Sequence, residues 1–478
     1  MHDALATDRA APALAWRRDD RYVWVPCLLL WALIVLMIVP EGLDYDVLNA
    51  STAPASAGLV SRVLWLALLA LSVTIIVVRV RLAVALVRVL NPFLALFALL
   101  AIASLVWSIV PSLTARRLYR MTTIMLACVA FVLVGWHVRR LQNVVRPALS
   151  AVLLASIVFV FAAPGLAIHS ESAPELAGAW RGLANHKNGL GALACTTLLF
   201  WLHAGLVREV RIVSALAGCA LAIVSLVMSR SSTAMAAAVF GALFIALSLY
   251  SPRGLRGGVP ALVVLLVAAL LVYALGVLNL VPGSGTMMAS IAAFSAKGST
   301  LTGRTEIWEI LSEHIAHNPW FGTGYGAYWT AGPVMGTDSY EFIRRMGNFY
   351  PGSAHNGYLD IVNDLGWAGL ACLVGYIGVH VRQTLQLLRV EPAQATLYLA
   401  LFFQQAVTNL SETHWFSVLS VDFVFITLAT TALARSLLEH RLRSVFGEPA
   451  ALTVATRGDA LAPWGVAHGV ADLPEVAR

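Results

Sequence analysis

The feature of this sequence that most limits its fold is a series of apolar runs, each 16 to 23 residues long, between Val23 and Ala434. A helix needs about 20 residues to cross a hydrocarbon layer roughly 30 Å thick. Only 12% of the residues are charged and 59% are hydrophobic, whereas an ordinary soluble domain is about one quarter charged. The runs therefore predict an all-α, polytopic membrane protein and exclude a soluble globular domain.

The apolar runs place about twelve spans along the chain. We expect these spans at 23–40, 59–79, 92–110, 121–137, 147–165, 188–207, 211–229, 232–250, 259–281, 366–381, 394–410 and 415–434. No small-residue cleavage site follows the first run closely, so this run predicts a retained anchor rather than a removable signal peptide. The chain is thereby divided into an N-terminal tail (1–22), nine spans (23–281), a long loop (282–365), three spans (366–434) and a C-terminal tail (435–478).

Basic residues predict how the spans are oriented, because the cytoplasmic loops of membrane proteins carry an excess of Lys and Arg. With a cytoplasmic N-terminus, the tails and loops on the cytoplasmic side hold 21 of the 32 basic residues. Both tails are therefore predicted to be cytoplasmic, and the long loop 282–365 is predicted to lie outside. The 11 basic residues on the outer side indicate that this side binds negative charge: Arg62, Arg116, Arg117, Arg120, Arg181, Lys187, Arg230, Lys297, Arg304, Arg344 and Arg345.

The long loop differs in composition from the apolar spans around it. An amphipathic run, Glu306–His317, is followed by the helix breaker Asn318-Pro319. Glycines at 322, 324 and 326 would then allow the backbone to approach a ligand closely. We expect the loop to carry amphipathic helices that lie against the outer membrane surface.

Two arginines on the outer side could bind an anion. Arg230 lies in a short polar break between two apolar runs, where an arginine is retained when it faces a wet cavity or reaches lipid headgroups. Arg304 lies near the start of the amphipathic helix, where free helix N–H groups favour an anion. Glu306 or Glu309 could instead pair with Arg304, so a binding role and a structural role both stay open.

Two further polar clusters lie on the same side. The cluster of Arg116, Arg117 and Arg120 could contact substrate or lipid headgroups equally well. His186 and Lys187 lie where an outer loop enters the sixth span. They could bind a polar substrate, or they could mark the level of the headgroups.

Histidine and acidic residues close to the end of the long loop could supply acid and base catalysis. The imidazole of His355, which Asn356 follows, could accept a proton from a hydroxyl group near neutral pH. Asp360 and Asp364 follow within the next helical turns, and either could orient the imidazole. Glu412 adds another acid on the last outer loop.

The sequence contains no pattern typical of a metal or disulfide site. Its five cysteines lie inside apolar runs, without a CxxC pair or a nearby histidine cluster. We therefore expect no metal and no cofactor, because arginines can supply the charge stabilisation that a cation would otherwise give.

One spaced motif, together with Arg230 and Arg304, resembles the O-antigen ligase and polymerase superfamily of bacterial envelope glycan enzymes. The motif is a His-Asn pair, nine further residues and Gly-x-x-Gly, which occurs here as His355-Asn356 followed by Gly366-Trp-Ala-Gly369. The strings at 303–308 and 318–324 are also similar to the superfamily. The polar strings at 185–191, 229–231 and 409–412 are most similar to its exopolysaccharide-polymerase branch.

The resemblance implies a glycosyltransferase of the bacterial inner membrane whose active site faces the periplasm. Its donor would be a glycan linked to undecaprenyl pyrophosphate, its acceptor a sugar hydroxyl or a lipid-linked glycan, and no nucleic acid would take part. Carried over residue by residue, Arg230 and Arg304 would hold the pyrophosphate and His355 would be the base. The implied reaction is metal-independent and inverts the anomeric configuration. Other outer-side residues would contribute to substrate binding: Arg116, Arg117, Arg120, His186, Lys187, Asn356 and Glu412.

Two other functions stay open at this point. An O-antigen ligase shares the histidine and arginine motifs but transfers the glycan to the lipid A core. A transporter of lipid-linked oligosaccharide would also use many spans and arginines that face a cavity. Such a transporter would be expected to show internal symmetry and charges distributed through the spans, whereas Asp422 is the main charge within a span here.

Overall fold

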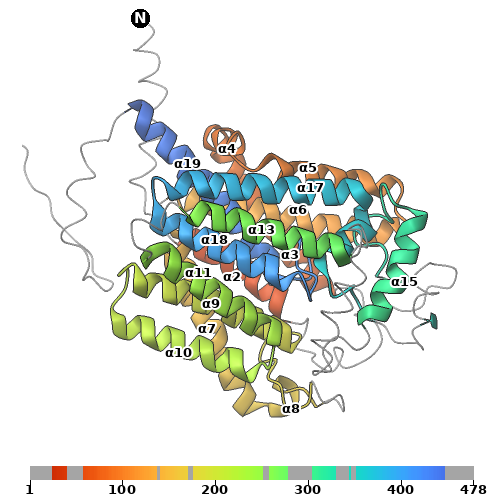
Figure 1. The fold of residues 1–478 in the computed structure, drawn as a ribbon, viewed down its shortest axis with the longest axis horizontal. Helices are drawn as coiled ribbons and strands as arrows, with labels where there is room; N and C mark the ends of the chain where they lie inside the picture. The colour runs from red at the N-terminus through yellow and green to blue at the C-terminus, as the bar shows by residue number, and fades with distance from the viewer. Residues whose placement is uncertain are drawn as a thin grey trace, which may run out of the picture.

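The computed structural model describes residues 24–39, 58–136, 140–170, 176–250, 258–277, 304–329, 344–345 and 351–446. All regular elements in these ranges are helices, and one isolated bridge joins Ile168 and Trp180. Figure 1 shows most of them as a bundle of roughly parallel and antiparallel rods. The elements are α2 (Trp24–Ile38), α3 (Leu59–Val78), α4 (Val80–Val87), α5 (Pro92–Ala103), the 3₁₀ helix η5 (Ser104–Val106), α6 (Pro111–Val134), α7 (Arg140–Ala162), α8 (Pro164–Ala167), α9 (Lys187–Leu206), α10 (Ile212–Met228), α11 (Ser232–Tyr250), α13 (Val259–Val277), α15 (Arg304–His317), α17 (Gly357–Leu388), α18 (Pro392–Thr408) and α19 (Val421–Phe446).

The helices confirm an all-α, polytopic membrane protein. Within the described ranges, seven helices are long and apolar enough to cross a membrane, or eight if the bent pair α4 and α5 counts as one span. Three shorter apolar helices lie at Trp24–Ile38, Ile212–Met228 and Val259–Tyr273. Each of the twelve predicted spans overlaps at least one helix of the structure.

Several helices begin or end outside the spans predicted for them. Helix α6 begins at Pro111 rather than at 121, because a proline at the first helical position needs no N–H partner. Helix α17 begins at Gly357 rather than at 366, because Asn356 caps its first turn. Helix α19 covers Val421–Phe446, whereas the sequence predicts a span at 415–434. Apolar runs therefore locate the spans but not the polar turns that extend the helices.

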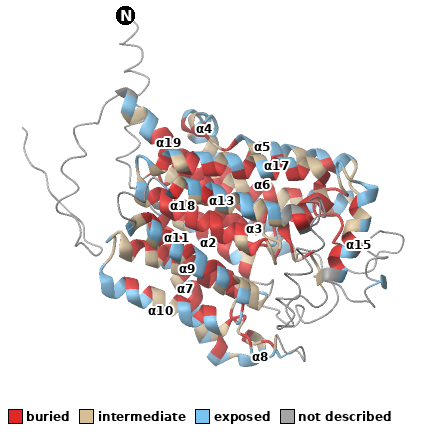
Figure 2. Cartoon of the chain, viewed as in Figure 1, coloured by how far each residue is buried: buried red, intermediate tan, exposed pale blue. Residues whose placement is uncertain are grey.

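Burial separates the central helices from those at the periphery. The spanning stretch of α19 is 100% buried inside the protein, whereas that of α3 is 17% buried. Figure 2 shows buried residues through the interior of the bundle and exposed residues on outer helices such as α10. Large apolar residues of α3, such as Leu59 and Val60, are exposed. In a protein that crosses a membrane, such apolar surfaces face lipid.

The loops gather at two opposite ends of the bundle, which α17 connects. Before α17 begins, the indole N–H of Trp308 donates to the carbonyl of Ala354, so α15 lies at this end. Beyond the other end of α17, Glu391 lies 3.9 Å from the guanidinium of Arg443 near the end of α19. The sequence assigns these two ends to opposite sides of the membrane. We call the first of them the α15 end.

Helix α17 is interrupted at Gly366, where the backbone adopts φ 64° and ψ −160°. The interruption exposes the carbonyls of Asn363 and Asp364, which accept hydrogen bonds from the N–H groups of Thr323 (3.0 Å) and Gly324 (2.9 Å). A Cβ atom at Gly366 would lie 2.2 Å from the carbonyl carbon of Trp320. A glycine is therefore required for the loop 318–329 to dock on α17.

We predict that Gly366→Ala destabilises the protein, whereas Gly378→Ala does not. The backbone conformation of Gly366 is essentially restricted to glycine and costs another residue about 1–3 kcal/mol, and the clash with Trp320 adds to this cost. Gly378 lies in the same helix, and a Cβ atom added there would have no neighbour within 4 Å, so alanine should be neutral or stabilise by up to about 1 kcal/mol. Thermal unfolding of both purified variants in detergent measures the difference, and equal midpoints would contradict the proposed docking.

Candidate functional site

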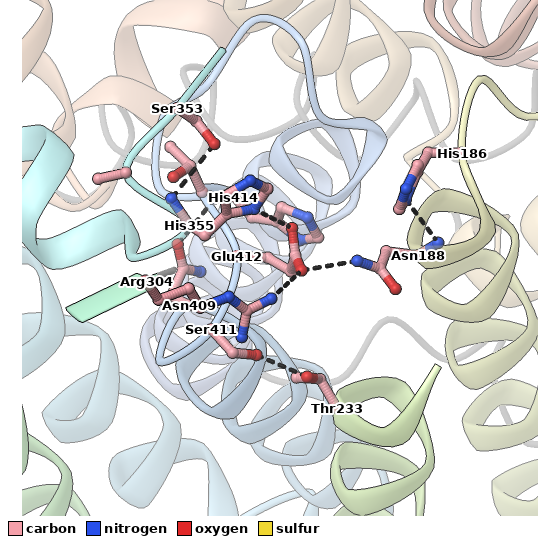
Figure 3. Close-up of polar contacts among 12 residues, drawn as sticks. His186, Asn188, Thr233, Arg304, Ser353, His355, Asn409, Ser411, Glu412 and His414 are labelled. Carbon is pink, nitrogen blue, oxygen red and sulfur yellow. Dashed lines mark hydrogen bonds and ion pairs between the residues drawn. The ribbon is translucent and has the colours of Figure 1, made fainter. Parts of the chain in front are cut away.

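The carboxylate of Glu412, in the loop between α18 and α19, joins three segments at the α15 end (Figure 3). Its Oε1 atom accepts hydrogen bonds from Asn188 Nδ2 at 2.6 Å and from Arg304 Nη2 at 3.2 Å. Its Oε2 atom lies 3.3 Å from Nδ1 of His355. Glu412 thereby connects the first turns of α9 and α15 with the segment that precedes α17. Two sequence-predicted residues, Arg304 and His355, meet at this one acid.

His355 is held in an uncommon backbone conformation. Its φ angle is 49°, in the left-handed region, which a non-glycine residue occupies only where the surrounding structure fixes it. The imidazole turns Nδ1 toward Glu412, so Nε2 is directed away from the carboxylate, and 30% of the side chain is exposed. A partner molecule could therefore reach Nε2.

The segment before His355 is fixed by Asp360 in the first turn of α17. One oxygen of Asp360 accepts the N–H of Ala354 at 3.0 Å, and the other accepts the indole N–H of Trp329 at 2.7 Å. The hydroxyl of Thr413 also donates to this carboxylate. Asp364 instead accepts the N–H of Gly326 at 2.8 Å. The acid that faces the imidazole is thus Glu412.

Asn356 caps the start of α17, and the residue after it joins this helix to the loop that carries Glu412. It is fully buried, and its Oδ1 accepts the N–H groups of the first helical turn, from Tyr358 and Leu359. The next residue, Gly357, donates its N–H to the carbonyl of Asn409 at 3.0 Å. A Cβ at Gly357 would lie 1.8 Å from Oδ1 of Asn409, so only glycine permits this approach.

The electrostatic surroundings keep Glu412 ionised. Burial alone would raise the pKa of the Glu412 carboxyl, but the hydrogen bond and charge of His355 and the charge of Arg304 outweigh it and lower this pKa to about 2. His414, two residues later, pairs with Asp422 at 2.7 Å. Burial opposes the charged form of His414, but the adjacent Asp422 carboxylate raises its pKa overall. This loop therefore contributes one member to each of two separate histidine and carboxylate pairs.

His186 caps helix α9 next to this cluster. Its Nδ1 accepts the N–H of Asn188 at 3.3 Å, so the hydrogen of the neutral ring is on Nε2. Burial lowers the pKa of His186 to about 4, which keeps the ring uncharged near neutral pH. The N–H of Lys187 donates to Nε2 of His169 at 3.0 Å, and the rings of His169 and His186 are 5.0 Å apart.

Arg230 lies at the same end of the bundle but contacts a different segment. Its φ angle is 51°, and the exposed guanidinium donates from Nη1 to the carbonyl of Ala177 at 2.8 Å. Three residues later, the hydroxyl of Thr233 lies 2.6 Å from that of Ser411, which adjoins Glu412. The backbone of this turn therefore lies beside the site, while the guanidinium is directed toward residue 177.

The predicted cluster of three arginines on α6 has three separate contacts. The exposed Arg116 donates to the carbonyl of Ser112 in its own helix at 3.2 Å. Arg117 donates to the carbonyl of Trp329 at 3.0 Å, and Arg120 lies over the ring of Trp65 at 5.7 Å. Arg117 thus supports the loop whose tryptophan binds Asp360.

Sequence reasoning missed Asn188, His169 and the organising role of Asp360. Asn188 belongs to a polar string at the start of a span, but its partner Glu412 is 224 residues away. No local pattern predicts such a pairing. Among the residues that the structure describes, no group of three or more His, Cys, Asp or Glu side chains could hold a metal ion.

Comparison with known proteins gives two similarities. Residues 217–374 match the family model described as O-antigen ligase, and this region contains Arg230, Arg304 and His355. The exopolysaccharide production protein ExoQ of Rhizobium meliloti (strain 1021) is 34% identical over 201 residues, which are 41% of this chain. The match spans 37% of the length of that relative. The two similarities support placing this chain in the O-antigen ligase and polymerase superfamily.

Proposed function

We propose that this protein is a metal-independent, inverting glycosyltransferase that acts in exopolysaccharide or O-antigen polymerisation. It transfers a glycan from undecaprenyl pyrophosphate to a sugar hydroxyl at the periplasmic face of the bacterial inner membrane. The observation that carries the proposal is the pair of contacts at Glu412, which bring a candidate anion-binding arginine and a candidate base to one carboxylate. The family similarity supports a glycan-transferring membrane enzyme.

In the proposed reaction, the acceptor hydroxyl oxygen forms a bond to the anomeric carbon of the donor glycan. The bond from that carbon to the pyrophosphate oxygen breaks, and its electron pair leaves with undecaprenyl pyrophosphate. His355 takes the hydroxyl proton on Nε2, while Glu412 faces Nδ1 and stabilises the imidazolium that forms. Attack opposite to the leaving group inverts the configuration of the anomeric carbon.

The leaving group needs charge neutralisation more than it needs a proton. Guanidinium groups bind phosphate oxygens through paired, charge-assisted hydrogen bonds. Arg304, on the first turn of α15, lies next to His355 through Glu412. Arg230 lies on the turn before α11, whose Thr233 contacts the same loop. We assign both arginines to the pyrophosphate, and His186 and Lys187 to the polar parts of the substrate.

The acceptor distinguishes the polymerase from the ligase alternative. The description of the matching family favours a ligase, whereas the name of the similar relative favours exopolysaccharide production. Incubation of the purified protein in nanodiscs with a lipid-linked repeat unit separates the two. Products that grow by whole repeat units would support a polymerase, and transfer only to added lipid A core would support a ligase. Transfer to neither acceptor would contradict the proposed function.

The proposed orientation predicts which engineered cysteines react from the periplasm. Ser112 lies at the α15 end and Ser444 lies near the end of α19, and both serines are exposed. Each is replaced by cysteine, as Ser112→Cys or Ser444→Cys. In a background without the five native cysteines, an impermeant thiol reagent added to spheroplasts should label position 112 and not position 444. The reverse labelling pattern would invert the orientation and the location of the site.

The role of His355 predicts that its removal affects transfer more than donor binding. His355→Ala should lower kcat by about 10²- to 10⁴-fold, while the donor still binds because its pyrophosphate contacts the arginines. His355→Gln should be nearly as slow, since glutamine cannot take up a proton. His317→Ala removes an exposed histidine of α15 and should leave both quantities unchanged.

Transfer rate and donor affinity are measured together for these three variants. If His355→Gln retained most of the transfer rate, His355 would only position the acceptor. Loss of donor binding together with transfer would move the histidine into the pyrophosphate site.

The donor arginines should not tolerate lysine. An ammonium group cannot reproduce paired guanidinium bonds, and one lost charged hydrogen bond costs about 1.5–3 kcal/mol. Arg304→Lys and Arg230→Lys should therefore each weaken donor binding by roughly tenfold or more. Arg211→Lys, an exposed position at the opposite end, should bind as the unmodified protein does. Normal glycan production by both site variants would show that these arginines anchor lipid headgroups instead.

A further inference from the structure

The two oxygens of Glu412 have different partners. Oε1 accepts from Arg304 and from Asn188, whereas Oε2 faces the imidazole of His355. Only 11% of the Glu412 side chain is exposed, and 21% of that of Arg304. Because water screens such partly buried charges incompletely, a change at one partner alters the interaction with the other. Glu412 is thus shared between the proposed donor arginine and the proposed base.

We propose that Glu412 is a positioning residue that couples donor binding to the base. The donor's pyrophosphate competes with Glu412 for the guanidinium of Arg304 and takes it over. The carboxylate, no longer neutralised by this arginine, then acts more strongly on His355 and favours transfer of the acceptor's proton to the ring. This inference rests on the proposed function.

The geometry indicates that Arg304 moves while Glu412 stays in place. The 2.6 Å hydrogen bond from Asn188 on α9 holds Oε1 independently of the arginine. The loop of Glu412 is fixed further by Asn409, whose Oδ1 accepts the N–H groups of His414 and Trp415. Arg304 lies at the very start of α15 and reaches Oε1 through a long, flexible side chain at 3.2 Å. An anion can therefore redirect the guanidinium without displacing the carboxylate from His355.

Removing the charge of Glu412 should have opposite effects on pyrophosphate binding and on glycan transfer. Gln at 412 retains an amide oxygen that can accept from Asn188, but it no longer holds Arg304 by charge and no longer repels a phosphate. Pyrophosphate binding should therefore become tighter. The same change deprives His355 of the charge that stabilises its protonated form, so transfer should become slower. A residue that only maintained the fold would weaken binding and transfer together.

The experiment compares the full-length protein with Glu412→Gln in nanodiscs. Binding of undecaprenyl pyrophosphate without glycan gives the dissociation constant, and transfer from a glycan-bearing donor gives kcat. Glu412→Gln should bind the pyrophosphate lipid about 3- to 10-fold more tightly and transfer glycan roughly 10²-fold or more slowly. Glu313→Gln is the matched control. Glu313 lies on the same helix as Arg304 and forms an exposed ion pair with Arg345, so its replacement should change neither quantity.

A double-mutant cycle isolates the competition for Arg304. In an Arg304→Gln background, Glu412→Gln should tighten binding of the pyrophosphate lipid by a smaller factor, because only the direct repulsion between the carboxylate and the phosphate is then removed. Glu412→Ala serves as a second variant that removes the charge if the glutamine variant does not accumulate as a folded protein by gel filtration. It should likewise bind more tightly and transfer more slowly.

The outcomes separate this inference from the proposed function. Weaker or unchanged binding of the pyrophosphate lipid by folded Glu412→Gln would overturn the coupling, and so would an unchanged kcat. Tightening by an equal factor in the Arg304→Gln background would also overturn it, because the competition would not involve this arginine. If the unmodified protein binds undecaprenyl pyrophosphate and transfers glycan, the proposed function stands whatever these variants show. If the unmodified protein does neither, the proposed function itself fails.

Discussion

The arrangement of the site depends on the buried carboxylate of Asp360. It accepts hydrogen bonds from Ala354, Trp329 and Thr413, which belong to three segments that are distant in sequence. Each donor is satisfied by the same acid, and leaving one such buried group unpaired costs about 1–3 kcal/mol. The relative positions of the segment before α17, the loop after α15 and the loop before α19 are therefore linked. His355 and Glu412 face one another because their segments share this partner.

Much of the fold could be predicted from the sequence, because the length and hydrophobicity of each apolar run identify a membrane span without information about the helices around it. The first residues of α6 and α17 could not be predicted in this way, since polar residues such as Asn356 extend helices beyond their apolar cores. The motif residues Arg304 and His355 do meet. Their common partner Glu412 could be suspected only as one more acid on the outer side, because no periodic pattern indicates contacts across such long stretches of chain.

The three arginines of α6 show that residues close together in the sequence need not share a binding partner. Their spacing suggests one patch of charge, because residues three and four apart on a helix share a face. In the structure, each of the three contacts a different partner: Arg116 its own helix, Arg117 a loop carbonyl and Arg120 an aromatic ring. Spacing along a helix is informative only when the surfaces around that helix are known.

Left-handed backbone at non-glycine residues gives separate support for the location of the site. In the described part of the chain, four such residues have positive φ angles: Arg208, Arg230, His355 and Phe416. Two of these are the residues that the family motifs single out. Phe416 packs against Phe97 with ring centroids 4.1 Å apart, so its conformation serves the core. Arg208 and Arg230 each directly follow the C-cap of a helix, where a left-handed residue commonly terminates the helix. Of the four, His355 is therefore the residue whose strained backbone points to the site.

The break in α17 has a consequence for where the candidate site lies relative to the bilayer. The part from Gly366 to Leu388 is about 34 Å long at 1.5 Å per residue, close to the thickness of a hydrocarbon core of roughly 30 Å. The part before Gly366 carries Asp360 and is held by loops rather than by lipid. The nine residues from Gly357 to Leu365 extend the helix by about 14 Å before this part begins. The candidate site, whose His355 precedes Gly357, therefore lies beyond the spanning part of this helix.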